Sequence, residues 1–431
     1  MTTVLGNTLP VSGGAGNGEK AFVVIVLLLS MGAFLNLDVT GPIEAQIETQ
    51  NTGMLGMQVL WSFLYVIMFG YYSGSCVRPL RNLRVVSPLF LLLGITFFSI
   101  LWSQDAWLTF RRSIALALTL VFGVYFASRF KLREQFRLLA WAFFACIIFS
   151  LFSELLGLNP DVRTPGWNGV FFNKVEFGRN MALSALVFLF WGKVDPEHKA
   201  LARAGFVAST VLVFPARDMT SLLVLAFSLM LLPYLHLALR RSWLWATGGM
   251  VSLLVSGIFF VSYAATNLEK LTGWFGKDPT LTGRVPLWIL STAMALRRPW
   301  LGYGFNAFWL PNETYTHRIW QLLHWMPPHA HNGILELWLE LGIVGTGLFL
   351  AVFVYYVAKA VNFLRQTSDP AAAWPLVFLV FLFLASLTES EFLGSNSVTF
   401  ILYVAVAATV CTKARSAPVG NRLATHEEGY A

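Results

Sequence analysis

The chain has 431 residues, of which 56% are hydrophobic and 12% are charged, and its formal net charge is +8. Soluble domains carry about a quarter charged residues, so a soluble globule of this size would lack the polar surface that it needs, and the polar bias of a disordered chain is missing too. The composition therefore predicts an integral membrane protein, in which basic residues between apolar runs indicate topology and not nucleic acid binding.

Twelve apolar runs are long enough, or nearly so, to cross a bilayer. In chain order they are 21–37, 55–72, 86–103, 113–128, 137–157, 178–192, 200–215, 220–239, 243–265, 332–357, 373–388 and 397–411. No cleavage site of the A-x-A kind follows the first run, so we expect a retained helix there. The expected fold class is an all-α polytopic membrane protein with about 12 transmembrane helices and one long, partly helical extracytoplasmic loop.

The distribution of Lys and Arg sets the expected orientation. With the N-terminus in the cytoplasm, 18 of the 30 basic residues fall in inside loops, whereas the first outside loop, 38–54, has none. We therefore expect both termini to be cytoplasmic. The expected division is a cytoplasmic tail 1–20, transmembrane helices 21–265, an outer loop 266–331, transmembrane helices 332–411 and a cytoplasmic tail 412–431.

The outer loop, residues 266–331, is the longest break in the apolar pattern, and it holds six of the 16 Trp and four of the seven His residues. Its aromatic content argues against disorder, so we expect a folded loop on the membrane face. Residues 284–297 are predicted to form a helix with Pro286 in its first turn. The Gly302-x-Gly304 pattern indicates a tight turn or, alternatively, a phosphate nest. The tryptophans indicate either an interfacial belt or flat faces for sugars or lipid.

The strongest local pattern, HAHNGILELWLELGIVGT, spans residues 329–346. His331 and Asn332 stand where the loop enters the tenth expected span. Because histidine exchanges a proton near neutral pH, His331 could accept the proton of a sugar hydroxyl. Glu336 and Glu340 share one helix face. They either brace the helix bundle through hydrogen bonds or, as costly carboxylates within a span, serve function.

Other chemistries lack their motifs. The chain has no Walker loop, no Asp-x-Asp among its seven aspartates and no nucleophile elbow. A zinc site built from His317, His324 and His329 fits no standard spacing, so we expect no metal and no cofactor.

Basic residues outside the cytoplasmic loops form a second candidate set. They include Arg163, Lys174, Arg179 and Arg217, together with Arg284 at the start of the loop helix. One interpretation is interfacial snorkelling. The other is anion binding, because arginine grips phosphate oxygens with a two-pronged fork. The second interpretation predicts an outward-facing positive basin for an acidic, lipid-linked substrate.

The sequence resembles the O-antigen ligase and polymerase superfamily of bacterial inner membranes, and it is most similar to the exopolysaccharide-production polymerase branch. The motifs that carry the resemblance are His331-Asn332-x9-Gly342-x-x-Gly345-Thr346, Thr282-Gly283-Arg284-x-x-Leu287-Trp288 with Pro299…Gly302-Tyr303-Gly304, and Gly169-Val170-Phe171…Asn173-Lys174.

The resemblance implies a metal-independent membrane glycosyltransferase whose active site faces the periplasm. A saccharide would pass from undecaprenyl pyrophosphate to an acceptor sugar hydroxyl, with His331 as the catalytic base and Arg284 as a catalytic arginine at the pyrophosphate. The family's second arginine would be Arg217, although Phe214-Pro215-Ala216 stands where many relatives are rich in serine. The remaining residues expected to bind substrate are Lys174, Arg179, Arg163, Asn332 and Glu340.

The expected partners are the lipid-linked donor, a glycan acceptor, membrane lipid and other polysaccharide assembly proteins, without nucleic acid. Polymerisation of exopolysaccharide or O-antigen repeat units is the favoured reaction. Ligation of polysaccharide to lipid A–core is the alternative within the family. A transporter or flippase of polysaccharide precursors, and a structural subunit of an export complex, are alternatives of other classes. Transporters often have inverted repeats and broken midplane helices, and the sequence shows neither.

Overall fold

The computed structural model describes residues 15–34, 55–74, 86–158, 166–241, 283–311, 313–367 and 369–413. Within these ranges the fold is all-helical, with thirteen α-helices and two short 3-10 helices, η2 (Ser99–Leu101) and η3 (Pro196–His198). The predicted all-α class is therefore confirmed for this part of the chain.

Most of the expected spans coincide with helices. The helices before the outer loop are α1 (Asn17–Ser30), α3 (Leu55–Gly74), α5 (Ser87–Phe98), α6 (Ala106–Arg129), α7 (Leu132–Leu155), α8 (Lys174–Val194), α9 (Lys199–Val213) and α10 (Met219–Arg241). Those after it are α15 (Gly333–Gln366), α16 (Trp374–Ser386) and α17 (Val398–Lys413). The expected span 243–265 lies outside the described residues, as do the two expected tails apart from residues 15–20 and 412–413.

Four of the described helices, α3, α6, α7 and α15, are long and apolar enough to cross a membrane. Shorter apolar helices include α5 with η2, α10, α16 and α17. These lengths and compositions indicate an integral membrane protein, and the total of about 12 crossings stays a prediction.

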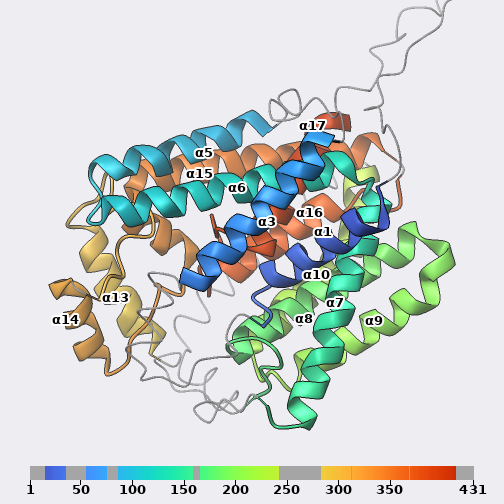
Figure 1. Cartoon of the computed structure of the whole chain (residues 1–431), viewed down its shortest axis with the longest axis horizontal. Helices are drawn as coiled ribbons and strands as arrows, with labels where there is room; N and C mark the ends of the chain where they lie inside the picture. The colour runs from blue at the N-terminus through green and yellow to red at the C-terminus, as the bar shows by residue number, and fades with distance from the viewer. Residues whose placement is uncertain are drawn as a thin grey trace, which may run out of the picture.

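The helices form two groups that meet along α8, α10 and α16. On one side, α5, α6 and α15 run beside each other, with α17 packed on α6 (Figure 1). On the other side, α8 packs against α7, α9 and α10. The loop helices α13 (Arg284–Ala295) and α14 (Thr314–Leu323) lie together at one end of the molecule (Figure 1). The loop is thus partly helical where it is described, as predicted.

Buried ion pairs tie the helices together at the end where α6 finishes and α7 begins. Arg129 donates from Nε to Oε1 of Glu19 at 2.7 Å. The fully buried Asp195, which follows α8, accepts hydrogen bonds from Arg133 at 2.6 Å and Arg137 at 2.7 Å. Burying a carboxylate without such partners would be costly. The residues of this set were predicted to share the cytoplasmic side, and they do share one end; which side of the membrane that end faces stays a prediction.

The long helix α15 is interrupted at Gly342, where φ is 67° and ψ is −173°. Segment 299–304 of the outer loop fills the interruption. The two amides after the break, in residues 343 and 344, donate to the carbonyls of Pro299 at 2.8 Å and Trp300 at 3.2 Å. The loop backbone therefore supplies hydrogen bonds that the helix itself does not make here.

The Gly302-x-Gly304 turn completes this contact from the loop side. The amides of Tyr303 and Gly304 donate to the carbonyls of Leu339 at 2.8 Å and Glu340 at 2.9 Å. A Cβ on Gly302 would lie 2.5 Å from the Leu339 carbonyl oxygen, so only glycine fits this close approach. Because these amides are already used, the tight-turn interpretation is right and the phosphate nest is wrong.

The predicted helix 284–297 is present as α13, two residues shorter at its end. Leu287 and Met294 face a second hydrophobic cluster, with Leu290 half-buried against it. The same cluster includes Leu335 and Leu339 of α15. Packing therefore joins the start of α13, which carries Arg284, to the start of α15, which follows His331.

We predict that Gly342→Ala destabilises the protein. The alanine Cβ would lie 2.1 Å from the Trp300 carbonyl oxygen, and φ at this position is positive. We therefore expect the free energy of unfolding to fall by more than about 1 kcal/mol and the melting temperature to be clearly lower. Gly347→Ala is the matched control, because the same helix has open space within 4 Å of that Cβ. Equal melting temperatures for the two variants in detergent would contradict the role of the break.

Candidate functional site

The carboxylate of Glu389, in the turn that follows α16, joins two of the predicted catalytic residues. Its Oε1 accepts a hydrogen bond from Nη2 of Arg284 at 2.6 Å, and its Oε2 lies 3.0 Å from Nδ1 of His331. The Glu389 side chain is 9% exposed, whereas those of Arg284 and His331 are 20% and 18% exposed. The pair predicted from separate motifs thus meets at one buried carboxylate, with both partners still reachable from outside.

Local backbone geometry fixes the direction of His331. Its φ of 47° lies in the left-handed region, which is uncommon for residues other than glycine. Asn332 follows as the N-cap of α15 and accepts hydrogen bonds from the amides of Ile334 and Leu335. When Nδ1 donates to Glu389, the lone pair of His331 lies on Nε2, which has no hydrogen-bond partner among the described residues.

His329 lies beside this pair. Its Nδ1 accepts the backbone N–H of His331 at 3.2 Å, and its Nε2 is 3.9 Å from Oε2 of Glu389. Burial is the largest cause that lowers the pKa of His329, and the neighbouring basic side chains of His331, Arg284 and Arg179 lower it further, to about 3, despite the opposing Glu389. His329 is therefore neutral at physiological pH.

Burial by itself would raise the pKa of Glu389. Interaction and hydrogen bonding with His331, followed by interaction with His329 and Arg284, outweigh burial and lower the pKa to about 2. Glu389 is therefore ionised under all ordinary conditions.

One ligand atom each from His329, His331 and Glu389 lie within 4.8 Å of one another, a spacing compatible with a divalent cation. The hydrogen bonds favour another use of the cluster. Because Nδ1 of neutral His329 accepts a hydrogen bond, its proton lies on Nε2, which faces Glu389. Both imidazoles then present N–H groups to the carboxylate, and Arg284 already offsets its charge.

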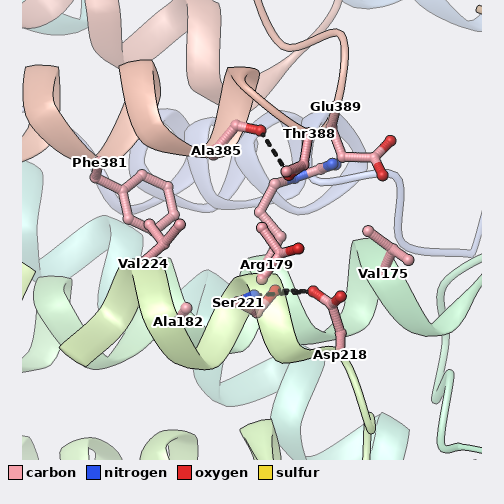
Figure 2. A pocket seen from close by; sticks show the side chains of 11 residues that line it. Val175, Arg179, Ala182, Asp218, Ser221, Val224, Phe381, Ala385, Thr388 and Glu389 are labelled. Carbon is pink, nitrogen blue, oxygen red and sulfur yellow. Dashed lines mark hydrogen bonds between the residues drawn. The ribbon is translucent and has the colours of Figure 1, made fainter. Parts of the chain in front are cut away.

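A second ion pair, in which Nη1 of Arg179 lies 2.5 Å from Oε1 of Glu391, stands next to the first. Arg179 reaches from α8 toward Thr388 and Glu389 across a small pocket (Figure 2). The polar residues of its wall are Arg179, Asp218, Thr220, Ser221, Thr388 and Glu389, and the others are Val175, Ala182, Val224, Phe381 and Ala385. The pocket is thus polar on the side that contains Glu389 and apolar between α8, α10 and α16.

The structure brings together three of the eight residues predicted for the site: His331, Arg284 and Arg179. Arg217 is exposed in the turn between α9 and α10, beside Asp218 of the pocket wall. Lys174 is the first residue of α8 and does not line the pocket. Arg163 lies outside the described residues. For these three residues, substrate binding stays a prediction.

The remaining two predicted residues have structural contacts. Asn332 caps α15, as described above. Glu340 is buried and lies two helical turns beyond the cap, where the backbone amide of Asn306 and the charge of Arg112 are its neighbours. Glu336, on the same face, accepts hydrogen bonds from Nε1 of Trp309 at 2.9 Å and the amide of Ala330 at 2.6 Å. These contacts favour the bracing interpretation for both glutamates.

Two acidic residues of the site, Glu389 and Glu391, were missed in the sequence. They stand in the short polar stretch TESE, residues 388–391, between the last two expected spans. On the predicted topology this stretch lies on the same side as His331. The predicted site came from basic residues and from the motif around His331, so it did not include this stretch. A carboxylate at the end of a span was the available signal.

Comparison with known proteins relates part of this chain to a known family. A family model described as O-antigen ligase matches residues 204–350, which include Arg217, Arg284 and His331 but end before Glu389. The chain is similar to "Exopolysaccharide production protein ExoQ" of Rhizobium meliloti (strain 1021), with 29% identity over 144 residues, or 32% of this chain and 33% of that protein.

The chain is also similar to a candidate polysaccharide ligase of Rickettsia typhi, with 34% identity over 132 residues, or 29% of this chain and 32% of that protein. A candidate polysaccharide ligase of Rickettsia prowazekii is 30% identical over 132 residues. The matched segments span about a third of the length of these relatives.

We predict that His329 makes the protein less stable in acid. The unfolded chain takes up a proton at His329 near pH 6.5, whereas the folded protein resists it until about pH 3. Stability therefore falls as pH drops below 6.5, by up to about 1.4 kcal/mol per pH unit. His329→Gln should make the melting temperature depend less on pH between pH 6.5 and 4.5. This window lies above the pH range in which glutamates of the unfolded chain titrate. An unchanged slope in the variant would show that His329 is not buried in its neutral form.

Proposed function

Because residues 204–350 of this chain match the O-antigen ligase family, we propose that the protein transfers a saccharide from undecaprenyl pyrophosphate to an acceptor sugar hydroxyl at the periplasmic face. We further propose that it polymerises exopolysaccharide or O-antigen repeat units. The observation that carries this proposal is the shared carboxylate of Glu389, which holds an imidazole and a guanidinium side by side.

His331 acts as the base. Glu389 accepts the N–H of Nδ1, so the lone pair on Nε2 is available for the proton of the acceptor hydroxyl. The ionised carboxylate also stabilises the imidazolium that forms, as the carboxylate of a catalytic triad does. The oxygen that loses this proton attacks the anomeric carbon of the donor sugar.

Arg284 and the start of α13 bind the pyrophosphate. Only one nitrogen of the guanidinium, Nη2, is engaged by Glu389 among the described contacts, and arginine has five N–H donors. Gly283 precedes α13 with a φ of 84° and provides no capping side chain. The positive end of the helix and its first amides therefore add to the attraction for an anion.

The bond between the anomeric carbon and the pyrophosphate oxygen breaks as the new glycosidic bond forms. The bonding electrons leave with the lipid pyrophosphate, whose added negative charge is stabilised by the preorganised arginine. Pyrophosphate is a good leaving group, so the step needs no general acid. A direct displacement inverts the anomeric configuration.

The name of the similar Rhizobium protein refers to exopolysaccharide production, whereas the names of the similar Rickettsia proteins refer to polysaccharide ligation, so the choice of polymerisation over ligation to lipid A–core is part of the proposal. Ligation uses the same base and cation, so the acceptor distinguishes the two reactions. A transporter would have no need for a base oriented by a carboxylate.

We predict that His331→Ala and Arg284→Ala abolish polymer synthesis while the protein remains inserted and abundant. The variants remove the base and the cation that stabilises the leaving group, each with an expected loss of at least about 10²-fold. His317→Ala and Arg297→Ala are matched controls, because both residues are exposed in the same loop. Polymer of normal length and yield from His331→Ala or Arg284→Ala would refute the site.

The lipid-linked saccharides that accumulate in a deletion strain, identified by mass spectrometry, distinguish the reactions. Single repeat units on the periplasmic leaflet are expected for a polymerase. Long chains without attachment to lipid A–core would indicate a ligase, and precursors confined to the cytoplasmic leaflet would indicate a flippase.

We also predict that Glu389→Gln lowers kcat by about 10²- to 10⁴-fold, because an amide neither stabilises the imidazolium nor fixes the tautomer of His331. Glu389→Asp should retain part of the activity. Glu197→Gln is the control, since Glu197 is exposed beside Asp195, in the buried ion-pair set at the end where α7 begins. Wild-type kcat in Glu389→Gln would remove Glu389 from the mechanism and leave His331 to be tested separately.

A further inference from the structure

The tryptophans of the outer loop differ in how their indole N–H groups are used. Trp288 donates to the carbonyl of Ala330 at 3.0 Å, Trp309 donates to Glu336 at 2.9 Å, and Trp320 donates to the carbonyl of Pro327 at 3.2 Å. Each of these rings serves the packing of the loop. Trp325 is half-buried, yet its N–H has no hydrogen-bond partner among the described residues. A tryptophan with a covered ring usually finds such a partner.

Trp325 lies beside His331 and beside the residue that precedes Arg284. Its ring centroid is 5.8 Å from that of His331, and the two planes are inclined by 41°. Its Nε1 lies so close to Gly283 that a Cβ there would be 3.1 Å away. Gly283 directly precedes Arg284, so a single ring borders the base and the residue before the cation.

Trp300, an exposed tryptophan of the same loop, differs from Trp325. It also lacks an N–H partner among the described residues, but it is 67% exposed and its neighbour Leu301 is 42% exposed. The ring therefore belongs to an open apolar surface, as expected for an interfacial belt. Trp325 instead has its ring beside the imidazole of His331 and its Nε1 beside Gly283.

We propose that Trp325 is the platform that binds the acceptor saccharide. A pyranose ring has an apolar C–H face and hydroxyls at its edge, so it can pack on the indole while one hydroxyl accepts the free N–H. This inference rests on the proposed glycosyl transfer, because it places the acceptor next to His331. Stacking would hold the reacting hydroxyl near Nε2 of His331, which is the positioning that the transfer requires.

The test measures kcat and KM of the purified full chain in nanodiscs with lipid-linked saccharide from a deletion strain. The free saccharide released from that lipid by mild acid is the competing probe. Trp325→Leu keeps apolar volume but removes the flat face and the N–H, so KM and the inhibition constant of the free saccharide should both rise about tenfold. Trp325→Phe keeps a flat face and should remain within about threefold of wild type. Trp300→Leu is the matched control and should leave both constants unchanged.

Several outcomes overturn the inference. Wild-type KM and inhibition constants in Trp325→Leu would do so. A lower kcat at unchanged KM, not restored in Trp325→Phe, would also do so, because that pattern indicates that Trp325 only positions His331. Weaker inhibition by undecaprenyl phosphate with unchanged inhibition by the saccharide would assign the ring to lipid. If His331→Ala is inactive while Trp325→Leu behaves as wild type, only this inference fails; an active His331→Ala would instead end the proposed function.

Discussion

The site depends on one carboxylate that has two partners. Glu389 is almost buried, and a buried charge is tolerable only when it is paired and hydrogen-bonded. Arg284 supplies the pairing charge and His331 supplies a hydrogen bond. The same contacts bring a cation and a base from distant parts of the sequence to a common point. Any substitution that removes this carboxylate therefore acts on both, through the charge beside Arg284 and through the tautomer of His331.

The break in α15 holds this arrangement in place. Arg284 begins α13 and His331 precedes α15, so the two helices must keep a fixed relation. Segment 299–304 provides it, because its backbone hydrogen-bonds to α15 on both sides of Gly342. The glycines at the contact are required by close approach, with 2.5 Å between a Cβ on Gly302 and a carbonyl oxygen. Segment 299–304 and the region around Gly342, which are separate motifs in the sequence, are thus in direct contact in the structure.

The length of the apolar runs predicted the helices, because a helix that crosses a bilayer has to show that length in its own sequence. The roles of His331 and Arg284 came from motif resemblance, and the structure adds that they meet. Local sequence could not reveal the partners of Glu336 and Glu340, which are set by Trp309 and the backbone of the loop. It also could not show that Glu389 faces His331, since a contact across 58 residues depends on how α15 and α16 pack.

Two members of the expected positive basin are paired with glutamates in the structure. Arg284 and Arg179 each face a glutamate at hydrogen-bonding distance. Unpaired arginines crowded at a membrane surface would repel each other and lose hydration. The glutamates therefore stabilise the folded site in the absence of substrate. A pyrophosphate then has to compete with carboxylates for the guanidinium donors. On the proposed function, that competition would favour a dianionic group with several oxygens over single carboxylates or monoanionic lipid, and so would favour a carrier linked through pyrophosphate.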